Sequence, residues 1–125
     1  MDQKDYALTF EARGNYLFVV VSGVRSRATV IDMTMKIFNA TQANSLSKVL
    51  IDVRDLDGQL GVLDSYLVVT DVFQNLRGKG LRKAAIIDLQ INSIREWFFE
   101  IVARNRMFNI RIFADKEKAL EWLDL

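Results

Sequence analysis

The chain has 125 residues, enough for one domain with a single core and too few for two ordinary domains. It contains neither cysteine nor histidine, which excludes disulfides, thiolate chemistry, the usual Ser-His and Cys-His nucleophile pairs and most zinc sites. The net charge of +1 gives no strong overall attraction to nucleic acid or to an anionic membrane. Its first residues are polar, and no apolar run approaches the roughly 20 residues of a membrane span. We therefore expect a cytoplasmic protein that is not an enzyme, has no cofactor or metal, and binds no nucleic acid.

The first elements predicted along the chain are two short strands. Residues 6–12 alternate between the two faces of a half-exposed strand, and residues 16–21 form a more continuously apolar strand. The residues between them, Arg13-Gly14-Asn15, are typical of a tight turn. The pattern predicts an antiparallel β-hairpin that ends at Ser22-Gly23.

A helix is predicted next, from about Ser26 or Arg27 to Gln42. Ser26 is placed to accept hydrogen bonds from the first turn, as an N-cap residue does. Apolar residues recur at helical spacing and predict one buried face, made of Val30, Met33, Ile37 and Phe38.

The stretch from residue 48 to residue 76 predicts a strand, a loop and a helix. Residues 49–53 are mostly β-branched and suited to burial on both faces of a sheet. Residues 54–61 contain two glycines and two aspartates, which favour turns, so we expect the strand to end at Val53. From Val62 to Leu76 apolar residues recur at helical spacing. Parallel α/β folds place ligands and partners at the carboxyl ends of their strands, so this loop is the first candidate for a working surface.

The remainder predicts two more strands, at residues 84–88 and 109–113, and two more helices. Ser93 and Glu96 form a capping-box pattern at the start of a helix that ends near Asn105. Asp115 is placed to cap a last short helix. The predicted order is ββαβαβαβα, a single α/β domain over residues 1–125 with four helices. Its five-stranded mixed sheet has an N-terminal antiparallel hairpin and four last strands that run parallel.

Four aspartates close in sequence, Asp52, Asp55, Asp57 and Asp64, raise the question of a metal or acid–base site. A calcium loop of the EF-hand type counted from Asp52 would need oxygen ligands where Arg54 and Leu63 stand. The calcium pattern therefore fails. Aspartates after a strand more often accept backbone hydrogen bonds in turns, so we assign neither a metal site nor a catalytic residue.

Aromatic residues gather on and just after the helix predicted over residues 93–105, at Trp97, Phe98, Phe99 and Phe108. Trp97 and Phe98 fall on the inward stripe of their helix, and core packing explains them first. Phe99 lies off that stripe, where it either widens the apolar face or contacts another subunit in a homodimer. A small apolar ligand between helix and sheet would also need an aromatic lining of this kind.

Three parts of the chain together resemble a known family. They are the hairpin, the segment Val49-Leu50-Ile51-Asp52-Val53-Arg54-Asp55-Leu56-Asp57-Gly58, and the ending Ile110–Asp115 followed by Ala119–Leu123. The chain resembles the STAS superfamily, and within it the bacterial SpoIIAA-like branch that is grouped with CRAL-TRIO lipid-binding domains. The resemblance covers nearly the whole chain. It implies a small α/β domain with a roughly sequential strand order. Members of the superfamily mostly bind proteins, and some related domains bind nucleotides or lipid-like ligands.

The resemblance to anti-sigma-factor antagonists further implies a regulatory kinase or anti-sigma-like protein as partner. In those antagonists the partner kinase phosphorylates a serine at the start of the helix after the third strand. The corresponding positions here fall near Leu60, Gly61 and Val62, and the nearest Asp-Ser pair, Asp64-Ser65, comes a few residues later. Ser65 is therefore the candidate phosphosite. The phosphorylation switch of the antagonists is not assigned to this chain, because the Asp-Ser pair comes a few residues later than in those proteins.

Two main hypotheses follow from the sequence. The favoured one is a non-catalytic regulatory module that binds a partner protein through a loop and helix face comprising Asp55, Asp57, Gly58, Gln59, Gly61, Asp64 and Ser65. The alternative is a CRAL-TRIO-like domain that binds a lipid or another small apolar ligand. An enzyme that uses Asp55, Asp57 or Asp64 is a third and weaker interpretation.

Overall fold

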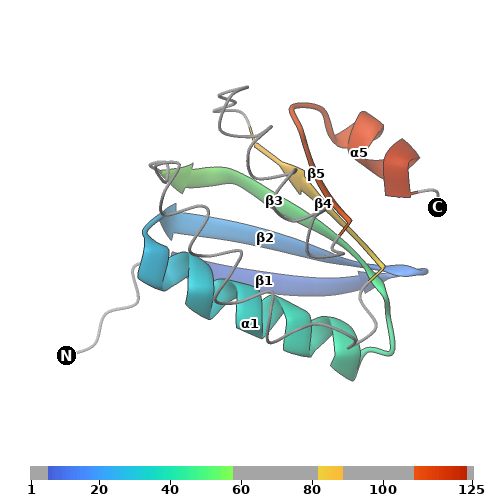
Figure 1. Cartoon of the computed structure of the whole chain (residues 1–125), viewed down its shortest axis with the longest axis horizontal. Helices are drawn as coiled ribbons and strands as arrows, with labels where there is room; N and C mark the ends of the chain where they lie inside the picture. The colour runs from blue at the N-terminus through green and yellow to red at the C-terminus, as the bar shows by residue number, and fades with distance from the viewer. Residues whose placement is uncertain (1–5, 58–81, 89–108, 124–125) are drawn as a thin grey trace.

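The described residues form a five-stranded α/β sheet with one described helix on each face (Figure 1). A computed structural model describes residues 6–57, 82–88 and 109–123. Two of the four expected helices fall within these residues, and the helices predicted over 62–76 and 93–105 lie outside them. No described helix is both long and apolar enough to span a membrane. The described elements are β1 (Tyr6–Arg13), β2 (Tyr16–Val24), α1 (Arg27–Ala43), β3 (Lys48–Asp57), β4 (Lys83–Ile87), β5 (Ile110–Phe113) and α5 (Lys116–Leu123).

The strands lie in the sheet in the order β1-β2-β3-β4-β5. β1 pairs with β2 antiparallel, and each later pair is parallel, which confirms the predicted hairpin and the four parallel strands. The hairpin closes at the pair Arg13 and Tyr16, with Gly14 at φ 61° in the connection. A residue with a side chain is strained in that left-handed conformation, and glycine is not.

The prediction that β3 ends at Val53 is wrong, because the strand continues through residues 54–57. β2 also runs past the predicted end at Ser22-Gly23, to Val24. After a shift in register, the two extensions pair with each other, with Gly23 opposite Leu56 and Val24 opposite Asp57. Leu56 is buried, so pairing with a neighbouring strand and burial of one apolar side chain overcome the turn preference of the aspartates.

Helix α1 begins where the sequence predicts. Ser26 is its N-cap: the Ser26 hydroxyl accepts a hydrogen bond from the Thr29 backbone N–H, and the Ser26 N–H donates to the Thr29 hydroxyl at 2.9 Å. This reciprocal capping box satisfies donors that the first turn leaves unpaired. The predicted inward stripe is confirmed at Met33, Ile37 and Phe38, which are buried against the sheet.

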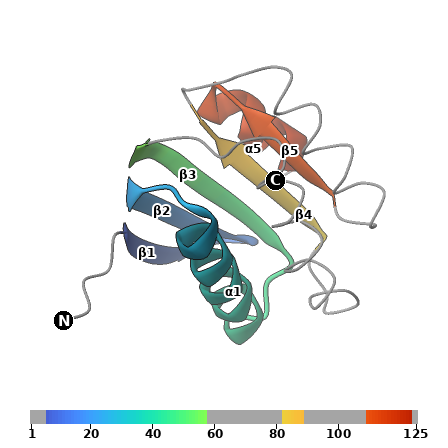
Figure 2. The ribbon, with the colours of Figure 1, turned by 60° about the vertical axis from the view of Figure 1, so that its left-hand side comes forward.

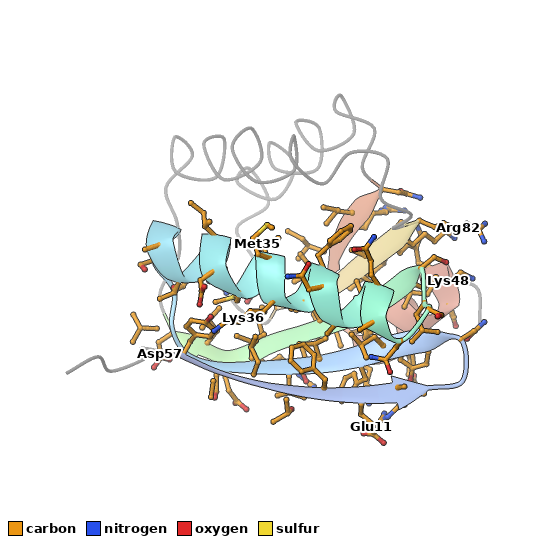
Figure 3. The ribbon with its side chains drawn as sticks, turned by 90° about the horizontal axis from the view of Figure 1, so that it is seen from below. Glu11, Met35, Lys36, Lys48, Asp57 and Arg82 are labelled. Atoms are coloured by element: carbon orange, nitrogen blue, oxygen red, sulfur yellow. The ribbon has the colours of Figure 1, made fainter. Side chains whose placement is uncertain are left out.

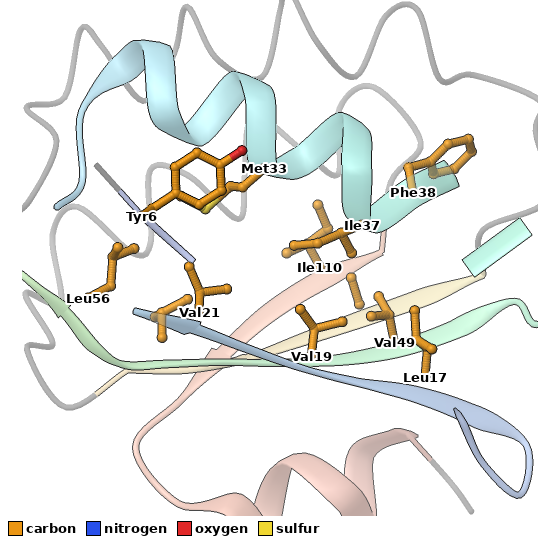
Figure 4. Close-up of a cluster of buried hydrophobic side chains, with 12 residues drawn as sticks. Tyr6, Leu17, Val19, Val21, Met33, Ile37, Phe38, Val49, Leu56 and Ile110 are labelled. Atoms are coloured by element: carbon orange, nitrogen blue, oxygen red, sulfur yellow. The ribbon is translucent and has the colours of Figure 1, made fainter. Parts of the chain in front are cut away.

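Each face of the sheet has its own helix (Figure 2). Between α1 and the sheet lies the larger apolar cluster, which includes Tyr6, Val19, Met33 and Val49 (Figure 4). On the opposite face α5 packs against β3, β4 and β5. The smaller cluster on that face contains Leu50, Ala85, Ile87, Ala119 and Leu123. Neighbouring residues of β3 thus enter different clusters, as the period of two in a strand requires, and burial of β3 on both faces is confirmed.

Candidate functional site

The candidate site lies at the edge of the sheet where the four parallel strands end. Arg25 follows β2, Asp57 ends β3, and Asp88 follows β4. Figure 3 shows Asp57 and Lys48 at opposite ends of β3, with Arg82 near Lys48. Because parallel strands all end on one side, charged residues that are far apart in the sequence meet at this edge.

A largely buried ion pair joins the strand ends. The Arg25 guanidinium donates to Asp88 Oδ2 at 3.1 Å, and the exposed fractions of the two side chains are 16% and 10%. Backbone bonds extend the connection, since the Arg25 N–H donates to the Asp57 carbonyl at 2.8 Å and the Asp88 N–H to the Phe113 carbonyl at 2.9 Å. The ends of β2, β3, β4 and β5 are therefore tied into one unit. We call this unit of tied strand ends the platform.

The pair of Arg25 and Asp88 was not predicted from the sequence. The two residues stand 63 positions apart, and nothing in the spacing predicts that they meet. The only local signal is that each is a charged residue directly after a buried strand. In an α/β fold that position is the carboxyl edge, and opposite charges there are candidates for pairing across the sheet.

An outward-facing patch with acidic and apolar character adjoins the platform. We define the carboxyl-edge patch as Val24, Asp55 and Asp57. Asp55 and Asp57 are exposed on β3, with the buried Leu56 between them, so alternation along the strand directs both carboxylates to the same face. Val24 pairs with Asp57, and its exposed fraction is 52%. Among the described residues, Val24 and Phe10 are the two large apolar residues that are exposed.

The structure thus places two of the predicted site residues and not the others. Asp55 and Asp57 belong to a strand rather than to a loop, which corrects their predicted setting, and they remain accessible at the carboxyl edge. The rest lie outside the described residues: Gly58, Gln59, Gly61, Asp64 and Ser65. The aromatic residues Trp97, Phe98, Phe99 and Phe108 also lie outside them.

Asp52 has a role separate from that of Asp55 and Asp57. Its carboxylate accepts two hydrogen bonds from the Arg54 guanidinium, at 2.9 Å from Nε and 2.7 Å from Nη2, and a third from the Arg54 backbone N–H. These bonds, and above all those from the guanidinium, hold the pKa of Asp52 below its ordinary value despite its burial. Among the described residues, no three acidic side chains gather into a site that could hold a metal ion.

The pair of Asp52 and Arg54 makes folding stability depend on pH. The folded pKa of Asp52 is depressed, so the pair stabilises the protein above the unfolded pKa of about 3.9 and loses that contribution as pH falls through the folded value. We expect Arg54→Met to be less stable than wild type at neutral pH and to approach it on acidification. Urea unfolding across a pH series measures this difference. A stability difference between Arg54→Met and wild type that stays constant with pH would contradict the stabilising role of the Asp52–Arg54 pair. Asp55→Asn, which removes an exposed carboxylate of the same strand, serves as the control.

The comparisons with known proteins bear on the fold. No family model and no curated protein matches the chain. Among solved structures, an uncharacterised protein with a SpoIIAA-like fold from Shewanella loihica PV-4 is similar over 98% of both chains, with 22% identity and a TM-score of 0.59. An anti-sigma factor antagonist from Mycobacterium paratuberculosis is similar over 98% of both chains, with 16% identity and a TM-score of 0.56.

These likenesses agree with the described elements. The sequential strand order and the opening hairpin are what the resemblance to SpoIIAA-like proteins implies, and both are present. At these levels of identity the likeness extends to the path of the chain and not to the residues of a site. The described strands and helices have a SpoIIAA-like fold.

Proposed function

We propose that this chain is a non-catalytic regulatory module that binds a partner protein at the carboxyl edge of its sheet. The observation that carries the proposal is the carboxyl-edge patch, where Asp55 and Asp57 stand beside the exposed Val24. Exposed carboxylates next to an exposed apolar side chain suit a partner surface that is basic and partly apolar. The expected partner is a regulatory kinase or an anti-sigma-like protein, in keeping with the antagonist from Mycobacterium paratuberculosis that shares the fold.

The platform below the patch supports this function physically. The pair of Arg25 and Asp88 and the backbone bond from Arg25 to Asp57 fix the strand ends on which the patch stands. A surface held in place before binding loses little conformational entropy when a partner docks. That pair also neutralises the charge of Arg25, and the two charged residues of the patch, Asp55 and Asp57, are both acidic.

Several features of the proposal lie beyond the described residues. We propose that the partner surface continues through Gly58, Gln59, Gly61, Asp64 and Ser65, with Ser65 as the candidate phosphosite. A phosphate at Ser65 would add nearly two negative charges to a surface that is already acidic. We further propose that residues 1–125 form one domain and that the protein acts in the cytoplasm.

The binding proposal predicts a charge-sensitive interaction. Asp57→Lys should abolish capture of the partner from a lysate of the producing cells, because a cation replaces an exposed carboxylate at the centre of the patch. The matched control is Glu121→Lys, which makes the same charge change at an exposed position of α5. Affinity capture followed by titration of the purified partner measures the effect. Equal loss with both variants, or no loss with Asp57→Lys, would contradict the proposal.

The alternative, a small apolar ligand, makes a different prediction. Native mass spectrometry of the purified protein should then show a copurified small molecule, and Asp57→Lys should leave it bound. The described aromatic pair is already packed, since the rings of Phe113 and Trp122 lie 5.8 Å apart and Leu123 beside them is fully buried. Phe113 and Trp122 thus belong to the packing between α5 and the sheet.

A further inference from the structure

The outer edge of β1 is a second surface with an interaction chemistry of its own. β1 forms one margin of the sheet (Figure 2), and its eight residues pair with β2 without any shift in register. In the part of the chain that the structure describes, no strand lies along its other side. Alternate residues of an antiparallel strand direct both backbone groups away from the partner. β1 therefore presents a row of donors and acceptors to its surroundings.

Within the described residues, this edge carries few of the features that usually protect an edge strand. Proteins commonly block such edges with charged side chains, above all lysine, or with proline, a bulge or a very short strand. The chain has no proline, β1 has no lysine, and the register shift of this sheet falls between β2 and β3. The two charged residues of β1, Glu11 and Arg13, form an ion pair at 2.9 Å. The strand is therefore electrically neutral and does not repel a second copy of itself.

Phe10 gives the edge an apolar contact near its middle. Its side chain is 43% exposed on the face that carries α1, opposite Val19 of β2. If two β1 strands pair antiparallel with Phe10 opposite Phe10 of the second copy, the aromatic rings meet across the two-fold axis. No like charges oppose each other in that register, whose other pairs are Leu8 with Ala12, Thr9 with Glu11, and Ala7 with Arg13.

We propose that two copies of this chain associate through β1 in this register, forming a continuous ten-stranded sheet. The electrical neutrality of the strand and the exposed Phe10 ring argue for a second copy as the occupant of the edge. Since the two β1 strands run in opposite directions, the carboxyl edges of the two sheets lie at opposite ends of the dimer. Both carboxyl-edge patches then remain open, and the dimer presents two partner surfaces.

The test uses the full chain, with light scattering after size exclusion over a range of concentrations. We expect wild type to dimerise and Phe10→Lys to raise the dissociation constant about tenfold or more, because two ammonium groups would face each other. Val24→Lys, which places the same charge at the other exposed apolar position, should dimerise like wild type. A monomeric wild type, or a Phe10→Lys variant that dimerises unchanged, overturns the proposal.

A second measurement decides the matter even if Phe10→Lys fails to fold. The chain has no cysteine, so Phe10→Cys introduces a single thiol. Directly opposed residues of paired strands have Cα atoms about 4.5–5.5 Å apart, within the span of a disulfide. Mild oxidation should cross-link Phe10→Cys and leave Val24→Cys monomeric. Equal cross-linking of the two variants, or none of Phe10→Cys, contradicts the register.

Discussion

Asp88→Ala should destabilise the protein by about 3–5 kcal/mol, because it leaves the Arg25 guanidinium buried without its counter-ion. The two side chains are 16% and 10% exposed, so water compensates little for the lost partner. Among the described residues, none accepts a hydrogen bond from the buried Nε of Arg25. Urea unfolding monitored by circular dichroism measures the change in the free energy of unfolding.

Two controls separate the ion pair from the loss of a side chain. Asp57→Ala removes an exposed carboxylate at the same edge and should change stability by no more than about 0.5 kcal/mol. The double variant Arg25→Met with Asp88→Leu replaces both charges by apolar groups and should recover much of the stability. If Asp88→Ala costs no more than Asp57→Ala, the pair does not hold the strand ends together.

Leu123→Ala should cost about 2–5 kcal/mol, as expected for a fully buried leucine that leaves a cavity. Leu123 is inaccessible to solvent and packs α5 onto Leu50, Ala85 and Ile87. Cationic contacts add to the attachment of α5, since Lys83 Nζ donates to the Trp122 carbonyl at 2.8 Å and Lys116 Nζ lies 4.7 Å from the centre of the Phe18 ring. These half-buried contacts cannot fill the cavity that the loss of the Leu123 side chain leaves.

The measurement for Leu123→Ala is again urea unfolding, here with Val24→Ala as the control. Val24 is exposed, so its truncation should change stability by only a few tenths of a kcal/mol, or about 0.5 kcal/mol at most. A Leu123→Ala variant as stable as Val24→Ala would show that α5 does not complete the core of this face of the sheet.

Local patterns in the sequence predict most of the described fold. The apolar period in β1, the capping serine of α1 and the capping Asp115 of α5 act between residues close together in the chain. The Asp115 carboxylate accepts from the Glu117 N–H at 2.9 Å, as the sequence predicts. These elements are predictable because their causes are local.

Features that depend on the neighbouring strand could not be predicted in the same way. The extension of β3 through Asp57 depends on the equal extension of β2 to Val24, which neither segment specifies alone. The pair of Arg25 and Asp88 requires the order of the strands in the sheet. For the candidate site, the sequence correctly directs attention to Asp55 and Asp57 but assigns them to a loop, because turn preference is local and strand pairing is not.

If the carboxyl-edge patch contacts a partner protein, a photoreactive side chain placed within it should cross-link to that protein. Photo-cross-linking in the producing cells provides the test, with a benzophenone amino acid placed at position 57 in one variant and at position 121 in another. We predict that position 57 yields a discrete cross-linked species containing a second protein and that position 121 yields none. A cross-link from position 121 alone, or from neither position, would contradict the claim.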